Sequence, residues 1–537
     1  ATPRGIATRA QATFAASMSA NPDLDEATAN LQDAFRETGT WLIDQGARYA
    51  GGNHTERHFG AFVLADHGQR LLAAADEIPD TVRADADPDA CIARLHRRLI
   101  DQFTATVSSF ERKRYVNLGH EANKAANLNA YIGLMGSRVR EEFDGTDWHL
   151  VASGDDATGT PIASPAYVIT LDADSVVNAN YARHLVGFLE APGHESVAVA
   201  QTPYSAIPGA SGAIELVAGA TTDMQFIAHQ GFTHYGATFW VGANAVLRKT
   251  ALDSIGEMTT ERGYPVPTFI QDRTVIEDTE STIDLAARGW SLHNEPHRLA
   301  YSATPPDFGT LVIQRRRWAN GGLLIFPKLL RYAFQRHRGR PLELLIRTHY
   351  LLSPALSSIG MLALLVLPVS ASYLSPWLVL SGIPYLLLYG RDLSLNGYRW
   401  ADLPRVYSFN WLLVPVNIAG VGKSIQQGLT GKKIPFGRTP KVEGRTAAPA
   451  WAVASLVVLT LYLALAGGAN LWQHNWMVAG FDTLTIAALL YGLLRFVGAS
   501  AAWEDLGVSR RAATTANAIA RRLSVPAGAR NEDRRPS

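Results

Sequence analysis

The chain has 537 residues, one cysteine and a formal net charge of +1. A nearly balanced charge gives no basic field of the kind that attracts nucleic acid, so nucleic acid is not an expected partner. The lone Cys91 excludes a disulfide framework and a cysteine metal cluster. Residues 1–340 mix apolar and charged side chains, whereas residues 346–498 contain long runs almost free of charge. This contrast predicts a soluble domain followed by a membrane domain.

The first part of the chain alternates short apolar runs, which favour strands, with amphipathic runs, which favour helices. The predicted elements are strands over residues 10–18 and 59–66, helices over 21–37, 69–76 and 88–108, a helix that begins at Asn123, and a loop over 143–165. The second strand ends on an acid, Asp66.

A third apolar run, residues 167–171, is rich in β-branched side chains and leads into Asp172 and Asp174. Open α/β sheets bind ligands just outside the carboxyl ends of their strands. Two acids at such a place need a partner, and a hard divalent cation that carries a phosphorylated substrate is suited to them. An acidic turn that caps a strand or a helix explains the same pair equally well.

The following residues continue the alternation of strands and helices. The predicted elements are a helix over 179–190, a strand over 196–201, a helix and loop over 212–235, a strand-turn-strand over 239–248 that passes close to a ligand, and a helix over 279–288. Glu277 and Asp278 stand at the head of the last helix, where acids often serve only as caps. This order predicts a doubly wound α/β sheet. The sequence has no G-x-G-x-x-G after the first strand, so a dinucleotide-dependent oxidoreductase is unsupported.

The C-terminal half contains four apolar segments of roughly the length that crosses a bilayer. They cover residues 351–370, 374–390, 451–467 and 477–497. The clusters of Lys and Arg that flank the apolar segments fall on one side of the membrane only if the segment 406–422 does not cross it. We therefore predict an interfacial or re-entrant segment near 406–441, with both termini in the cytosol. The predicted domains are a cytosolic domain (1–322), a juxtamembrane or interfacial helix (323–345), a transmembrane domain (346–498) and a partly disordered cytosolic tail (499–537).

Five motifs occur in one order along the chain. They are Asp66 after a strand, Lys-Ala-Ala-Asn-Leu-Asn at 124–129, Asp-Ala-Asp at 172–174, Glu-Asp at 277–278 and Gln-x-x-Arg-Trp at 314–318. The ordered set resembles the family 2 processive glycosyltransferases of the cellulose synthase superfamily, and in particular the bacterial glucan glucosyltransferases, over roughly residues 10–445. The resemblance implies an α/β GT-A domain, with a doubly wound, Rossmann-like mixed sheet, followed by an α-helical transmembrane domain.

The resemblance also implies a role for each motif. Asp66 matches the acid that holds the uracil of a UDP-sugar, Lys124 and Asn127 lie near the donor, Asp172 contacts the nucleotide, and Asp174 coordinates Mg²⁺ or Mn²⁺. Asp278 matches the general base, with Glu277 beside it, while Gln314, Arg317 and Trp318 match the motif at the mouth of the acceptor channel.

The chemistry of glycosyl transfer requires the same residue types. The departing diphosphate gains negative charge, which a divalent cation and an arginine such as Arg317 stabilise, and the attacking hydroxyl needs a carboxylate base. Trp318 offers an aromatic face to a sugar ring. Taken alone, the arginines at 315–317 also fit a juxtamembrane cluster that attracts anionic lipid, and Trp318 fits an interfacial anchor.

We therefore expect an inverting hexosyltransferase in a bacterial-type inner or plasma membrane, with a cytosolic catalytic domain. Its expected donor is UDP-glucose, its acceptor a growing β-glucan or related polysaccharide, and its other partners the lipid bilayer and export proteins. Two alternatives remain open. One is a non-processive transferase that glycosylates a lipid carrier, and the other is a catalytically inactive membrane transport or scaffold protein.

Overall fold

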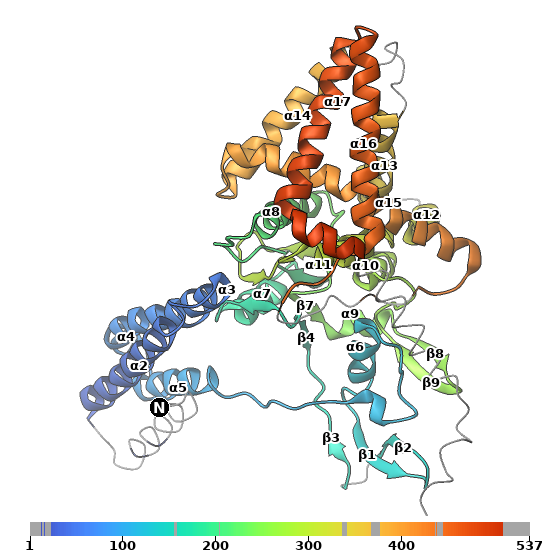
Figure 1. Ribbon diagram of the computed structural model, residues 1–537. Helices are drawn as coiled ribbons and strands as arrows, with labels where there is room; N and C mark the ends of the chain where they lie inside the picture. Colours follow the sequence, from blue (N-terminus) through green and yellow to red (C-terminus); the bar gives the residue numbers. More distant parts are fainter. Residues whose placement is uncertain are drawn as a thin grey trace, which may run out of the picture.

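The computed structural model describes residues 12, 16, 23–154, 158–202, 204–335, 341–366, 376–434, 437 and 444–507. Of the strand predicted over 10–18, only residues 12 and 16 are described, and both are helical. The tail predicted over 499–537 is described as far as residue 507, and residues 499–507 are helical. The described elements form a helical unit at the N-terminal end, a central α/β domain and a layer of long helices on one side of that domain (Figure 1).

The N-terminal unit is entirely helical. It contains α2 (Leu24–Ala47), α3 (His54–His58), the π-helix η1 (Phe59–Ala65), α4 (Asp66–Ala84) and α5 (Pro88–Asp101). The strand predicted over residues 59–66 is therefore wrong. Small residues bring the helices close together, because a Cβ added to Gly39 of α2 would lie 2.7 Å from the carbonyl oxygen of Gly68 in α4. The apolar run buries itself through helix packing rather than in a sheet.

A small antiparallel sheet projects from the central domain, where the sequence predicted only a loop. Strands β1 (Arg138–Phe143), β2 (Trp148–Ala152) and β3 (Thr160–Pro161) pair in the order β2-β1-β3. The loop prediction for 143–165 is wrong, because cross-strand pairing between β1 and β2 overrides the turn-forming composition.

The central sheet is mixed and has the strand order β10-β6-β7-β4. Its strands are β4 (Tyr167–Thr170), β6 (Val197–Gln201), β7 (Ala245–Arg248) and β10 (Ser291–Asn294). Strand β10 is parallel to β6, whereas β7 runs antiparallel to both β6 and β4. The mixed α/β sheet confirms the predicted fold class. Strand β4 is at an edge of this sheet within the described residues.

Helices surround the sheet, and two short strand pairs form separate two-stranded sheets. The helices are α6 (Lys124–Ile132), α7 (Tyr181–Glu190), α8 (Ala213–His234), α9 (Lys249–Ser254) and α10 (Glu277–Ala287). Strand β5 (Ser175–Val177) pairs with β11 (Ala300–Ser302), and β8 (Glu257–Glu261) forms a hairpin with β9 (Tyr264–Thr268). The predicted strand-turn-strand at 239–248 contains only its second strand, β7.

The helical layer follows the sheet in the sequence. It comprises α11 (Phe308–Ala319), α12 (Gly322–Gln335), α13 (Pro341–Val366), α14 (Pro376–Leu395), α15 (Leu403–Thr430), α16 (Ala450–Trp472) and α17 (Trp476–Gly492), which continues into the π-helix η4 (Leu493–Val497). Among the described residues, α16 and the α17–η4 segment are long and apolar enough to cross a membrane. Leu461, Leu465 and Leu484 on these helices are exposed, as lipid-facing side chains would be. The spans predicted at 351–370 and 374–390 stay predictions.

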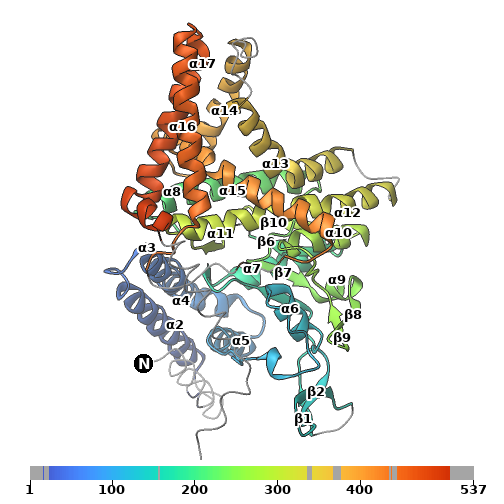
Figure 2. The same cartoon turned by 45° about the vertical axis from the view of Figure 1, so that its right-hand side comes forward.

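Helix α15 links the two layers. It is a continuous helix over the segment predicted to be interfacial or re-entrant, and it lies between the sheet domain and the upright helices α16 and α17 (Figure 2). Its Phe409 and Leu412 share one buried core with Leu311 and Val312 of α11. The helix that carries the Gln-x-x-Arg-Trp motif is therefore packed directly against the helical layer.

The crossing of α15 and α11 depends on Gly420, where an added Cβ would lie 2.6 Å from the Arg316 carbonyl oxygen. We expect Gly420→Ala to lower the free energy of unfolding by about 1–3 kcal/mol, because the two helices would have to separate. Gly422→Ala is the matched control, since Gly422 is on the same helix with nothing within 4 Å of the added Cβ. There, alanine should be neutral or stabilise by about 0.5–1 kcal/mol. Thermal unfolding in detergent compares the two variants, and equal melting temperatures would contradict the close crossing.

Candidate functional site

Asp172 and Asp174 lie in the tight turn between β4 and β5. The Ser175 amide donates to the Asp172 carbonyl oxygen at 3.0 Å, which closes the turn. The hydroxyls of Ser175 and Ser302 lie 3.0 Å apart and fasten the turn to β11. Both carboxylates are therefore held at the carboxyl end of β4, where the sequence predicted them.

Lys124 connects this turn with a second loop. It is the first residue of α6, whose N-terminus is capped by the Asn123 side chain. Its Nζ lies 2.5 Å from Asp172 Oδ1 and donates to the Gly242 carbonyl oxygen at 2.9 Å. Tyr204 donates its hydroxyl to Asp172 Oδ2 at 3.1 Å. Burial opposes ionisation of Asp172, but Lys124 and Tyr204 outweigh it and lower the pKa of this carboxyl.

Gly242 brings the loop against the acid pair at the start of α10. Its φ of +87° is the left-handed region that favours glycine, and an added Cβ would lie 2.4 Å from Asp278 Oδ2. The same residue thus accepts a hydrogen bond from Lys124 and contacts Asp278. Three of the sequence motifs, at 124–129, 172–174 and 277–278, meet around this glycine.

Asp278 and Glu277 are half-buried acids, and the pKa of each is raised. Burial raises the pKa of Asp278, although hydrogen bonds from the Thr279 amide and hydroxyl, and the charges of Lys124 and Arg317, act in the opposite direction. Burial, together with repulsion by Asp278, raises the pKa of Glu277 to about 7. Carboxylates shifted in this way are suited to accept a proton near neutral pH.

Helix α11 supplies the cationic and aromatic side of the site. The positive charge of Arg317 acts on Asp172, Glu277 and Asp278, so this guanidinium lies in the electrostatic field of all three acids. The Trp318 ring is 6.4 Å from the Tyr204 ring, and the guanidinium of buried Arg315 lies over it at 4.6 Å. Gln314 is half-buried on the same helix. Arg317 and Trp318 therefore converge with the acids, as the motif order predicted.

Two predicted donor residues lie elsewhere. Asp66 is the first residue of α4, not the end of a strand, and its carboxylate accepts from Asn178 at 2.9 Å and pairs with Arg70 at 2.7 Å. Asn127 is bonded by Arg112 and lines a cavity of about 670 Å³ beside β4, together with Phe110, Tyr131 and Ile169. Neither side chain joins the cluster around Gly242 in the described contacts.

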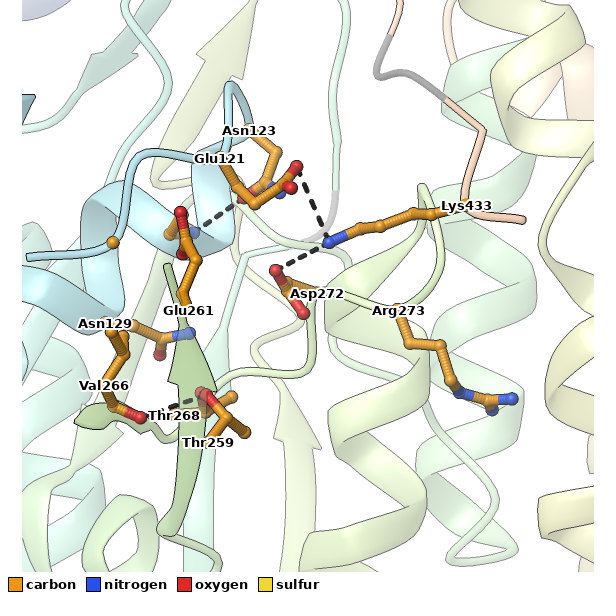
Figure 3. A network of polar contacts seen from close by, with 12 residues as sticks. Glu121, Asn123, Asn129, Thr259, Glu261, Val266, Thr268, Asp272, Arg273 and Lys433 are labelled. Carbon is orange, nitrogen blue, oxygen red and sulfur yellow. Dashed lines mark hydrogen bonds and ion pairs between the residues drawn. The ribbon is translucent and has the colours of Figure 1, made fainter. Parts of the chain in front are cut away.

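A polar network that the sequence did not predict braces the loop before Lys124 (Figure 3). Lys433, which follows α15, lies 2.7 Å from Asp272 and 3.8 Å from Glu121. The His120 amide donates to Glu261 of the β8–β9 hairpin at 2.6 Å. These contacts connect the end of α15, the hairpin and the start of α6, so the helical layer also helps to position Lys124.

Tyr204 is the main site residue that sequence reasoning missed. It follows strand β6 in Thr202-Pro-Tyr204, and a polar aromatic residue just after a strand of an α/β sheet is a usable signal. Burial and the negative charges of Asp172 and Asp278 hold the pKa of its hydroxyl well above the usual value, so the hydroxyl stays a donor.

The fold and the site define a glycosyltransferase of the GT-A-like kind. Residues 167–390 match the model of glycosyl transferase family group 2. Residues 167–390 are therefore similar to the family 2 glycosyltransferases, the family that the ordered motifs resembled.

Individual relatives agree with this assignment. The UDP-forming cellulose synthase catalytic subunit of Komagataeibacter sucrofermentans is 27% identical over 165 residues, which cover 30% of this chain and 20% of that protein. Cellulose synthase 1 of Novacetimonas hansenii is 28% identical over 166 residues, covering 30% of this chain and 10% of that protein. The chain thus spans at most about a fifth of the length of these relatives.

A solved structure, a mannosyltransferase of Pyrobaculum calidifontis in complex with GDP-Man and Mn²⁺, aligns with 75% of this chain and 99% of its own at 14% identity and a TM-score of 0.33.

Substitution of Gly242 tests whether its contact with Asp278 positions the acid. We expect Gly242→Ala to lower the rate of sugar transfer about 10²-fold, because the methyl group would displace the Asp278 carboxylate. Gly236→Ala is the matched control, since Gly236 also has a positive φ, of +65°, but its added Cβ meets nothing within 4 Å. Both variants place an alanine at a positive φ, so an equal loss of activity would contradict the positioning role.

Proposed function

We propose that this chain is a membrane-embedded, inverting glycosyltransferase that transfers a hexose, with UDP-glucose as the donor, to a growing β-glucan or related polysaccharide. The observation that carries the proposal is the convergence of Lys124, Asp172 and Asp278 on the Gly242 loop, with Arg317 and Trp318 on the adjacent helix. The relatives named as UDP-forming cellulose synthases support this choice of donor and product.

Asp278 acts as the general base. It is half-buried at the start of α10, and its raised pKa makes it a stronger base than an exposed aspartate. In the reaction it removes the proton from the acceptor hydroxyl as that oxygen attacks the anomeric carbon of the donor. A single displacement inverts this carbon, so an α-linked donor gives a β-linked product.

Lys124 and Arg317 stabilise the departing diphosphate, since both are cations beside the acidic turn. Asp174 belongs to the same turn and offers carboxylate oxygens, which are the ligands that Mg²⁺ and Mn²⁺ prefer. These residues fit a divalent cation, which would be held by Asp174 and would neutralise charge on the diphosphate when bound. Asp172 is already engaged by Lys124 and Tyr204, so its role is to orient the lysine beside the nucleotide.

Trp318 and Gln314 bind the acceptor. The Trp318 ring is backed by the Arg315 guanidinium, which leaves it suited to stack on a sugar ring. Because α11 packs against α15 in the helical layer, the acceptor would leave the site toward α16 and α17. We propose that the product is passed across the bilayer by this layer, with the catalytic domain on the cytosolic side of a bacterial-type plasma membrane and export proteins as partners.

A panel of nucleotide sugars with purified chain tests the donor and the product. We expect UDP release with UDP-glucose, dependence on Mg²⁺ or Mn²⁺, and a polymer on size analysis. Asp278→Asn should lower turnover by at least about 10²–10⁴-fold, the usual contribution of base catalysis. Its melting temperature at pH 8 should be unchanged or higher, because a carboxyl with a raised pKa destabilises the fold once it ionises.

The same assay separates the alternatives. If the product is a single sugar on a lipid acceptor, the chain synthesises a glycolipid and not a polymer. If the folded protein releases no UDP with any donor, the chain is a catalytically inactive transport or scaffold protein. Full turnover in Asp278→Asn would reject Asp278 as the base.

The acid pair also predicts the pH dependence of the reaction. Burial raises both carboxyl pKa values, and repulsion by Asp278 adds to the rise at Glu277, to about 7. The base form is therefore lost as pH falls through neutrality, and kcat/KM should fall with it. Glu277→Gln removes the neighbouring acid and should move this fall of kcat/KM, the acid limb of the pH profile, to lower pH. Glu257→Gln, at an exposed position, is the control that should leave the limb in place. An unmoved limb in Glu277→Gln would show that the pair does not govern activity.

A further inference from the structure

Three side chains with metal-binding atoms converge on the face of the domain formed by α7 and the β10–β11 connection. They are His184 of α7, and Glu295 and His297, which follow β10. One nitrogen of each imidazole and one carboxylate oxygen all lie within 4.8 Å of one another. His184 Nε2 is 2.9 Å from Glu295 Oε2, and His297 Nδ1 is 2.6 Å from Glu295 Oε1. None of these residues takes part in the sugar-transfer site.

The central carboxylate is held rigidly. Glu295 is buried, with its side chain 4% exposed, while the side chains of His184 and His297 are 41% and 72% exposed. The Glu295 backbone amide donates to the Gln201 carbonyl oxygen at 2.8 Å, and the Glu295 carbonyl oxygen accepts from the Gln230 side chain at 3.1 Å. A fixed carboxylate therefore lies beneath two imidazoles that solvent and ions can reach.

The neighbouring titratable groups are further histidines. His293 of β10 and His194 after α7 both stack on Phe188, at 3.9 and 4.1 Å. A buried carboxylate flanked by two imidazole nitrogens is suited to a divalent cation.

We propose that His184, Glu295 and His297 form a second metal site, which binds Zn²⁺. Two imidazole nitrogens and one carboxylate oxygen are a ligand set that zinc takes with one further position open to water. Imidazole ligands favour zinc over Mg²⁺, which prefers oxygen, so the site is chemically distinct from the acidic turn at Asp174. The ion would tie α7 to the segment that leads through β11 into α11.

Calorimetric titration of Zn²⁺ into the metal-free chain tests the site. The full chain is used in detergent without a polyhistidine tag and with saturating Mg²⁺, so that oxygen ligands are occupied. We expect one zinc ion per chain, with affinity at least tenfold weaker in His184→Ala and in His297→Ala. His234→Ala, an exposed histidine at the end of α8, is the control and should bind as the unaltered chain does.

A second readout is independent of calorimetry and of catalysis. Zinc should raise the melting temperature of the unaltered chain and of His234→Ala, but not of His297→Ala. Since His184 and His297 are partly or largely exposed, their substitution should leave the metal-free melting temperature unchanged. Failure of the unaltered chain to bind zinc, or unchanged zinc binding in both His184→Ala and His297→Ala, would overturn the proposal.

Discussion

The ion pair between Lys124 and Asp172 is the interaction on which the site depends. Asp172, Glu277 and Asp278 are three half-buried acids, and the positive charge of Lys124 acts on all of them, which offsets the cost of placing these charges close together. The lysine also bonds to the Gly242 carbonyl, so one side chain fixes the positions of the acidic turn and the loop beneath Asp278. Without it, the acids would repel one another and the site would open.

The helical layer also contributes to this arrangement. Helix α15 packs against α11, which carries Arg317 and Trp318, and its C-terminal extension reaches Asp272 through Lys433. Arg317 and Trp318 are thus carried by a helix, α11, whose position is set by apolar packing against α15. Movement of the helical layer would therefore be transmitted directly to the acceptor side of the site.

Sequence patterns predicted the catalytic half of this domain better than its periphery. The strand before Asp172, the helix that begins near Glu277 and the approach of the 239–248 segment to the site follow from local residue order, because each motif sits at an element boundary. The strand predicted at 59–66 was wrong because apolar composition alone does not distinguish a strand from a packed helix. This segment packs closely on α2, where a Cβ added to Gly60 would lie 2.6 Å from the Gly46 carbonyl oxygen. Tyr204 and Lys433 act across distant parts of the chain, which local patterns do not encode.

Strand β4 holds the acidic turn, yet within the described residues it has a sheet neighbour, β7, on one side only. Ile169 and Leu171 on and after this strand are 40% and 44% exposed, beside a cavity lined by Phe110 and Tyr131. Unpaired amides and carbonyls along such an edge are a template for another extended segment. The strand that leads into Asp172 and Asp174 is therefore also an edge at which the sheet is open to edge-to-edge aggregation, which increases with protein concentration.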